Sequence, residues 1–183
     1  MAETALRVWT LEEFLAWDEA QEGAHEFDGV EPIPMNPPTT RHQVILLELL
    51  DALRRSAKPV RVLPGVMIVT KEGRARRIPD IAVVPRDAPL STPVGSPIVV
   101  VEIASPSTSR TDTVAKVAEY TALPTLRHYL LLEQARAAGT LHSRNPDGFW
   151  TAQSLQPGAS VALAELDLRF PLDDCYAGLP DEA

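Results

Sequence analysis

The sequence predicts an α/β protein, α+β by content, in which a mixed β-sheet is flanked by helices. Three observations predict this class. Apolar β-like runs alternate with helical segments that begin at capping motifs. The run Ile98 to Ala104 is apolar at nearly every position, which is typical of a strand buried on both faces. Turn-bounded runs follow the last helix, so the sheet is expected to close with a hairpin.

The 183 residues fit one domain, since about 100–200 residues per domain is usual. No internal repeat divides the chain. We therefore expect a single domain over residues 1–183. Within it we expect an N-terminal helix and hairpin over 1–38, a central core over 39–135, and a closing hairpin and tail over 136–183.

The first helix is expected from about Leu11 to Ala20. Thr10 can cap its N-terminus, and Glu13 three residues later completes a capping box. Trp9 and Phe14 are spaced for a hydrophobic staple across the same turn. These signals agree on where the helix begins.

The stretch from His25 to Met35 is short and carries turn residues, so we expect a hairpin around Asp28-Gly29. Asn36-Pro37-Pro38 then breaks the chain, and a second helix begins at Thr39 or Thr40 and ends near Ser56.

Thr40 and Gln43 can form the capping box of that second helix. Its apolar stripe consists of Leu46, Leu49, Leu50 and Leu53. His42 lies one turn before Leu46 on the same face, which turns the imidazole toward the protein body.

Two β-like runs, Arg61 to Thr70 and Arg77 to Val84, are expected to pair through a turn at Lys71-Glu72-Gly73-Arg74. The buried strand Ile98 to Ala104 comes next, and a helix from about Ser109 to Ala122 follows it. The remaining expected strands are Arg127 to Glu133, Gly139 to Arg144 and Phe149 to Leu155.

The charge balance excludes a protein with general affinity for polyanions. The formal net charge is −8, from 17 Lys plus Arg and 25 Asp plus Glu, so any attraction to nucleic acid has to be local. One cysteine cannot form an intrachain disulfide, and we expect a cytoplasmic protein. No apolar run approaches the ~18 residues of a membrane span, so no membrane is expected as a partner.

Asp80 and Glu102 are the residues that a purely structural role explains least well. Both belong to strands whose neighbours are apolar, where an unpaired carboxylate is costly. If the two strands pair antiparallel with Val84 opposite Ile98, Asp80 lies opposite Glu102. A hard divalent cation would relieve the repulsion between two facing carboxylates.

Lys116 follows on the next helix, where it shares one side with Asp112 and Tyr120. Its ammonium could orient or help to deprotonate an attacking water and stabilise charge developing on phosphorus. Asp112 and Lys116 could equally form an ordinary surface ion pair. A basic group before Asp80 could contact phosphates or be a solvated hairpin tip; it consists of Lys71, Arg74, Arg76 and Arg77.

These residues resemble the Uma family, within the restriction-endonuclease-like PD-(D/E)XK superfamily. The resemblance is carried by Pro79-Asp80, by Val101-Glu102-Ile103, and by Asp112, Lys116 and Tyr120. Other similar stretches are His25 to Gly29, Met35 to Pro38 with Arg41-His42, Glu102 to Thr108, and Arg127 to Leu130.

The resemblance implies a nuclease core with Asp80 and Glu102 as metal ligands, and with Lys116 as the superfamily lysine moved from a strand onto a helix. Ala104 occupies the usual lysine position. His42 and Glu26 are further candidates for the catalytic site. His42 could instead be a structural histidine, and either Glu26 or Glu31 could be the residue that points into the site.

The leading prediction is a nuclease that hydrolyses phosphodiester bonds, with DNA as substrate and Mg²⁺ or Mn²⁺ as cofactor, and with two copies pairing as a homodimer. One alternative is a catalytically silent nuclease-fold protein that serves as a binding or assembly module. Another is a hydrolase acting on a small phosphate, which a narrow pocket would favour.

Overall fold

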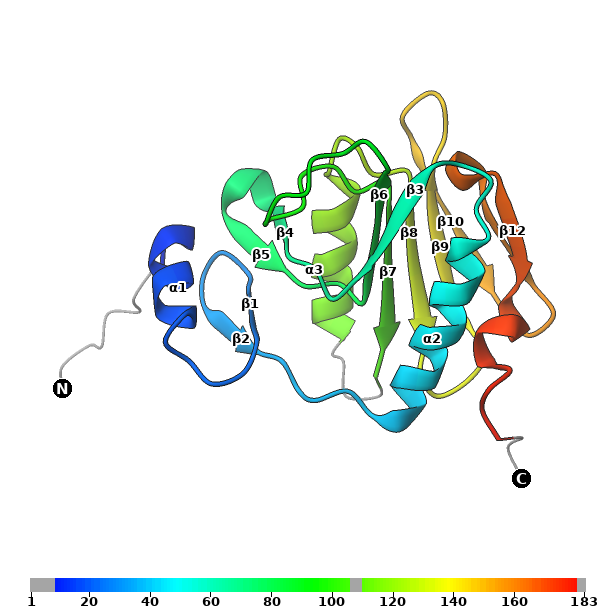
Figure 1. The fold of residues 1–183 in the computed structure, drawn as a ribbon, viewed down its shortest axis with the longest axis horizontal. Helices are drawn as coiled ribbons and strands as arrows, with labels where there is room; N and C mark the ends of the chain where they lie inside the picture. The colour runs from blue at the N-terminus through cyan, green and yellow to red at the C-terminus, as the bar shows by residue number, and fades with distance from the viewer. Residues whose placement is uncertain (1–8, 106–109, 181–183) are drawn as a thin grey trace.

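The computed structural model describes residues 9–105 and 110–180. Its main element is a six-stranded sheet in the order β10-β9-β8-β7-β6-β3 (Figure 1). β7 and β8 run parallel, and the other neighbours pair antiparallel. The strands are β3 (Val60–Pro64), β6 (Ile81–Pro85), β7 (Val99–Ala104), β8 (His128–Glu133), β9 (Gly139–Arg144) and β10 (Trp150–Leu155). This mixed sheet confirms the predicted fold class.

Two helices, α2 (Thr40–Arg54) and α3 (Arg110–Thr121), cover opposite faces of this sheet. Side chains alternate between the faces of a strand. Val101 therefore packs in one core cluster with Leu49 of α2, and Val100 packs in the other with Tyr120 of α3. α3 also makes the crossover that the parallel pair β7 and β8 requires. Neither helix, nor any other in the described ranges, is long and apolar enough to cross a bilayer.

The N-terminus of α2 differs from the predicted capping box by one residue. Thr39 is the N-cap, and its hydroxyl accepts a hydrogen bond from the N–H of His42 at 3.2 Å. Thr40 is the first helical residue. Either threonine can cap a helix, although only Thr40 has a glutamine three residues later, and Thr39 is the one with the extended backbone of an N-cap.

A smaller sheet in the order β2-β1-β5-β4 forms, together with helix α1, an N-terminal lobe at the left of Figure 1. Its elements are α1 (Leu11–Asp18), β1 (His25–Phe27), β2 (Pro32–Pro34), β4 (Ile68–Thr70) and β5 (Ala75–Arg77). The capping box of Thr10 and Glu13 is present as predicted. Phe14 stacks on Phe27 with ring centroids 4.8 Å apart, which joins α1 to β1.

The two long strands predicted before residue 85 are each broken, and that prediction was wrong. β3 and β4 separate at Pro64-Gly65, where Gly65 has a φ of 59°. β5 and β6 separate at Ile78-Pro79, and proline has no N–H for the ladder. The hairpin expected at residues 71–74 therefore belongs to the small sheet. Asp80 stands at the junction between the two sheets.

The last part of the chain forms a two-stranded sheet that the sequence did not predict, β11 (Ser160–Leu163) with β12 (Leu168–Pro171). Phe170 and Cys175 pack in the same core cluster as α2. Residues 106–108 of the stretch Glu102 to Thr108, and the expected helix start at Ser109, lie outside the described residues.

Candidate active site

Two carboxylates from neighbouring strands form the centre of the site. β6 and β7 pair Ile81 with Val101 and Val83 with Val99, and the same register sets Asp80 opposite Glu102. The predicted antiparallel register is confirmed. Asp80 precedes β6, and Glu102 lies within β7 on the face that α3 covers.

Asp80 is held by hydrogen bonds to both of its carboxylate oxygens. Oδ2 accepts the backbone N–H of Ile103 at 2.6 Å, one residue beyond Glu102 on β7. Oδ1 lies 3.0 Å from Nε2 of His42, in the first turn of α2. The histidine that the sequence places toward the protein body therefore contacts Asp80.

Glu102 receives two contacts from α3, both at Oε1. Lys116 Nζ lies 3.2 Å away, and the hydroxyl of Tyr120 donates at 2.8 Å. Lys116 and Tyr120 are one helical turn apart, so both reach the same carboxylate. Lys116 Nζ also lies 3.2 Å from Oε2 of Glu26 on β1. Lys116 thereby bridges the N-terminal lobe and the main sheet.

Glu26 is fixed from its other side by Arg77. Arg77 Nη1 lies 3.1 Å from Glu26 Oε2, and the N–H of Ile78 donates to Oε1 at 3.0 Å. The same guanidinium makes two hydrogen bonds of 2.8 Å to Glu119 of α3. Arg77 is 1% exposed, so this network is internal. It connects β1, β5 and α3 behind the carboxylate pair.

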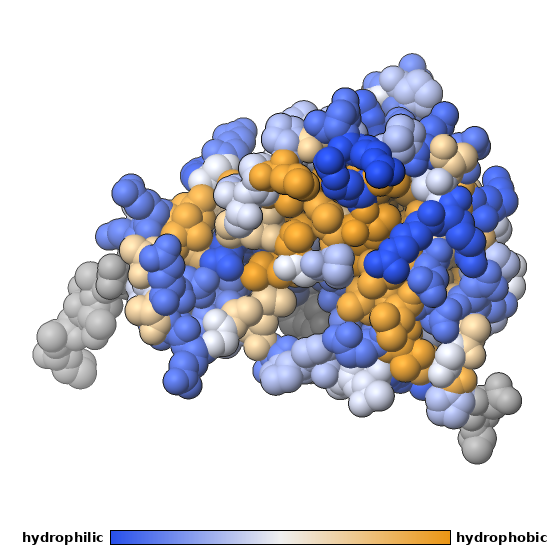
Figure 2. All heavy atoms as spheres, in the orientation of Figure 1, coloured by the Kyte–Doolittle hydropathy of each residue, from blue (hydrophilic) through white to orange (hydrophobic). Residues whose placement is uncertain are grey.

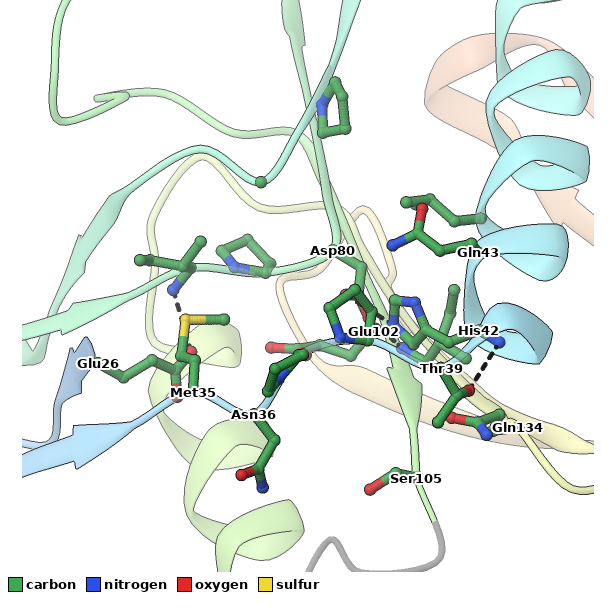
Figure 3. Close-up of a pocket in the computed structure, with 18 of the residues that line it drawn as sticks. Glu26, Met35, Asn36, Thr39, His42, Gln43, Asp80, Glu102, Ser105 and Gln134 are labelled. Carbon is green, nitrogen blue, oxygen red and sulfur yellow. Dashed lines mark hydrogen bonds and ion pairs between the residues drawn. The ribbon is translucent and has the colours of Figure 1, made fainter. Parts of the chain in front are cut away.

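A cavity of about 850 Å³ opens in front of these groups. Figure 3 shows Asp80, Glu102 and His42 close together in it, with the chain running from Met35 past Asn36 to Thr39 across the view. Figure 2 shows the molecular face hollowed between the N-terminal lobe and α2. The site is therefore a recess rather than a flat surface.

Burial gives the site unusual electrostatics. It raises the pKa of Glu102 to about 7, and Asp80 and Glu26 add to the rise while Lys116 and Tyr120 oppose it. Burial lowers the pKa of Lys116, but the carboxylates of Glu102 and Glu26 outweigh burial and raise this pKa above its ordinary value. Lys116 therefore stays an ammonium at neutral pH. The hydrogen bond to Asp80 raises the pKa of His42.

The donor set fits a hard divalent cation that binds through few protein ligands. Four carboxylates line the cavity in the described part of the chain, and Lys116 is the one lining side chain there with a permanent positive charge. The four are Glu26, Asp80, Glu102 and Asp112. Those same ranges contain no group of three or more His, Cys, Asp or Glu side chains arranged to hold a metal. Asp80 and Glu102 suit Mg²⁺ or Mn²⁺, which are satisfied by one or two carboxylates plus water.

The basic group predicted for phosphate contacts does not form one exposed patch. Arg77 is buried against Glu26 and Glu119, and Arg76 pairs with Asp18. Lys71 and Arg74 are exposed at the hairpin, and Lys71 also lies 3.1 Å from Glu119. Arg76 and Arg77 are therefore structural cations in this fold.

The sequence left open whether Glu26 or Glu31 points into the site, and it did not indicate the contacts that Tyr120 and Glu119 make. Glu26 is buried at the site, and Glu31 is exposed on the hairpin. Tyr120 packs against the sheet, and its hydroxyl also contacts Glu102. Its spacing of four from Lys116 was the available signal. Glu119 carried no such signal, because its partner Arg77 is distant in sequence.

Comparison with known proteins agrees with this fold. The Uma2 family model, described as "Putative restriction endonuclease", matches residues 11–173. An uncharacterized protein of Synechocystis sp. is 29% identical over 175 residues, covering 92% of this chain and 91% of that protein. A crystal structure from Anabaena variabilis, described as a "putative nuclease belonging to DUF820", superposes with a TM-score of 0.71 at 18% identity, covering 92% of this chain and 98% of that one.

Proposed function

The chain belongs to the Uma2 family, and on this premise we propose that it is a metal-dependent nuclease that hydrolyses phosphodiester bonds of nucleic acid, with DNA as its substrate. The observation that carries the proposal is the pairing of Asp80 with Glu102 in one recess, with Lys116 3.2 Å from Glu102. Two carboxylates can hold a divalent ion, and the ammonium of Lys116 can contact an anionic substrate bound beside that ion.

Asp80 and Glu102 would hold Mg²⁺ or Mn²⁺. When bound, the ion supplies a Lewis acid that polarises a phosphoryl oxygen. The four carboxylates lining the cavity favour a cation and disfavour a bare phosphate. A bound ion would reverse the local field where the substrate has to approach.

Lys116 acts as a fixed positive charge rather than as a base. Its raised pKa keeps the ammonium protonated, so it stabilises negative charge developing on phosphorus. Glu26 contacts the same ammonium at 3.2 Å, as Glu102 does. His42 orients Asp80 through the contact at 3.0 Å.

The test is cleavage of single-stranded, duplex and branched DNA with Mg²⁺ or Mn²⁺ by the wild type, Asp80→Asn, Glu102→Gln and the control Glu31→Gln. Glu31 is exposed, so its substitution makes the same charge change away from the site. We expect the wild type and the control to cut and both site variants to lose activity. No cutting of any substrate, or equal cutting by all four proteins, would contradict the proposal.

A silent binding module is the second candidate, and one observation favours it. Protein groups already hydrogen-bond to both carboxylates, His42 and the N–H of Ile103 to Asp80, and Lys116 and Tyr120 to Glu102. Titration calorimetry with Mn²⁺ separates the two candidates. A nuclease requires binding that Glu102→Gln weakens, whereas a silent module gives no heat that depends on Glu102.

A further inference from the structure

The reactive groups lie at the bottom of the recess. The side chains of Glu102, Lys116 and Asp80 are 12%, 14% and 20% exposed. The strap, which we define as residues 35–39 between β2 and α2, runs past the carboxylates in Figure 3. Partial burial of all three groups favours a strand segment that can enter the recess over one that stays on the outside of a stacked duplex.

The size of the recess leads to the same restriction. Its volume of about 850 Å³ falls in the range of pockets that enclose small ligands, roughly 300–1,000 Å³. A double helix, whose major groove alone is about 12 Å wide, is recognised on extended surfaces rather than in such a pocket. The recess has the dimensions of a small number of nucleotides.

Apolar side chains converge on the recess from three places in the chain. Ile33 and Met35 come from β2 and the strap, Leu46 comes from α2, and Ile78 comes from the junction between the two sheets. We call these four residues the apolar wall. Phosphate contacts do not explain such a wall beside an ionic centre. The faces of an unstacked base do, because they lose their stacking partner when a strand opens.

Amide side chains accompany the apolar wall. Asn36, Gln43 and Gln134 line the same recess, and Figure 3 places them around the Asp80 and Glu102 pair. Amides can donate hydrogen bonds to, and accept them from, the Watson–Crick edges of bases. These edges are exposed only when the base is unpaired. The net charge of −8 adds a further reason, since base contacts have to supply affinity that general phosphate attraction does not.

We propose that the recess binds a single-stranded or extruded segment of nucleic acid, with an unpaired base against the apolar wall and its phosphate beside Asp80, Glu102 and Lys116. The proposal rests on the proposed function and adds the substrate class. Intact duplex is a poor ligand, and strand ends, flaps and bubbles are good ones.

The experiment measures binding by fluorescence anisotropy with Ca²⁺ in place of Mg²⁺. The probes are a labelled 12-nucleotide single strand, the blunt duplex of the same sequence, and a single strand whose central positions lack bases. We expect the intact single strand to bind about tenfold more tightly than the other two, the order of effect that stacking of a base gives. Equal affinity for single strand and duplex, or for intact and abasic strands, overturns the proposal.

Met35→Ala and Val30→Ala are the matched variants. Both residues are exposed apolar positions of the N-terminal segment, at 39% and 58%, so either protein should fold, and only Met35 lines the recess. Met35→Ala should weaken binding of the single strand about fivefold and leave duplex binding unchanged, with Val30→Ala equal to the wild type. Identical affinities for the two variants contradict the assignment of the apolar wall.

The outcomes also separate the two proposals. Selective binding of the single strand without cleavage of any substrate overturns the nuclease and supports the binding site. Cleavage together with binding that favours intact duplex supports the nuclease and overturns the single-strand binding site.

Discussion

Arg77 on β5 and Glu119 on α3 form a two-point ion pair, with Nε to Oε2 and Nη2 to Oε1 both at 2.8 Å. The side chains are 2% and 3% exposed, and Thr70 donates a further hydrogen bond to Glu119 at 3.0 Å. α3 is the helix that carries Lys116. The ion pair therefore fixes the N-terminal lobe against the helix on which the proposed chemistry depends.

Arg77→Met should destabilise the protein strongly. It removes the guanidinium that pairs with both buried carboxylates, Glu26 and Glu119, and breaking one side of a buried pair costs about 3–5 kcal/mol. Arg74→Met is the control, because Arg74 is exposed on the same hairpin and should change stability by less than about 0.5 kcal/mol. Urea denaturation gives both free energies of unfolding. A loss of similar size in the two variants would show that the network is not what holds the lobe.

Glu119 should make the protein sensitive to acid. Burial raises the pKa of Glu119, but hydrogen bonds from Arg77, Lys71 and Thr70 outweigh burial and hold this pKa below its ordinary value of 4.5. A folded-state pKa below the unfolded one contributes stability that is present above pH 4.5 and lost as pH falls through the folded value.

The measurement is the free energy of unfolding at pH values from 6 to 3 for the wild type, Glu119→Gln and the exposed control Glu22→Gln. The wild type and the control should lose stability more steeply below pH 4.5 than Glu119→Gln. Parallel curves for all three proteins would exclude this role of Glu119.

Thr39→Ala should weaken the start of α2. The hydroxyl of Thr39 caps the helix by accepting the N–H of His42, and loss of such a cap costs about 1 kcal/mol, or a Tm lower by roughly 2–4 °C for a domain of this size. Thr40→Ala is the neighbouring control and should change the Tm by less, since Thr40 is the first helical residue. A larger loss in Thr40→Ala would restore the capping box expected from the sequence.

Lys116→Gln should lower the cleavage rate about 100-fold without weakening cation binding. The variant removes the positive charge beside the phosphate site, and it also removes a competitor for Glu102. Lys58→Gln, in an exposed turn, should cut at the wild-type rate. Rates and Mn²⁺ affinities are measured in parallel. Weaker Mn²⁺ binding with an unchanged cleavage rate would contradict the assigned role.

The centre of the site could be predicted because it depends on local patterns. Asp80 and Glu102 interrupt strands that are otherwise apolar, and antiparallel pairing across residues 86–97 leaves few registers that keep both faces buried. Lys116 could be placed by its position on the following helix. The mixed sheet followed from the order of the same runs.

The rest depended on contacts between distant residues. Burial of Arg77 requires Glu119, 42 positions away, and no local pattern distinguishes it from the exposed Arg74. The breaks at Pro64-Gly65 and Pro79 assign continuous β-like runs to two sheets, which only tertiary packing decides. The cation, the DNA substrate, the cytoplasmic location, the single domain and the homodimer stay predictions.

The register between β6 and β7 also determines where relatives of this chain can differ in length. Insertions in residues 86–97 lengthen a connection and leave the pairing of Asp80 with Glu102 unchanged. Deletion of one residue from Val99–Val101 would turn Glu102 to the other face of the sheet, toward the apolar core beneath α2. Relatives can therefore differ in the length of this connection away from Ala88 and Val94, which are hydrogen-bonded to Arg61 and Met67, whereas the number of residues in β7 has to stay constant.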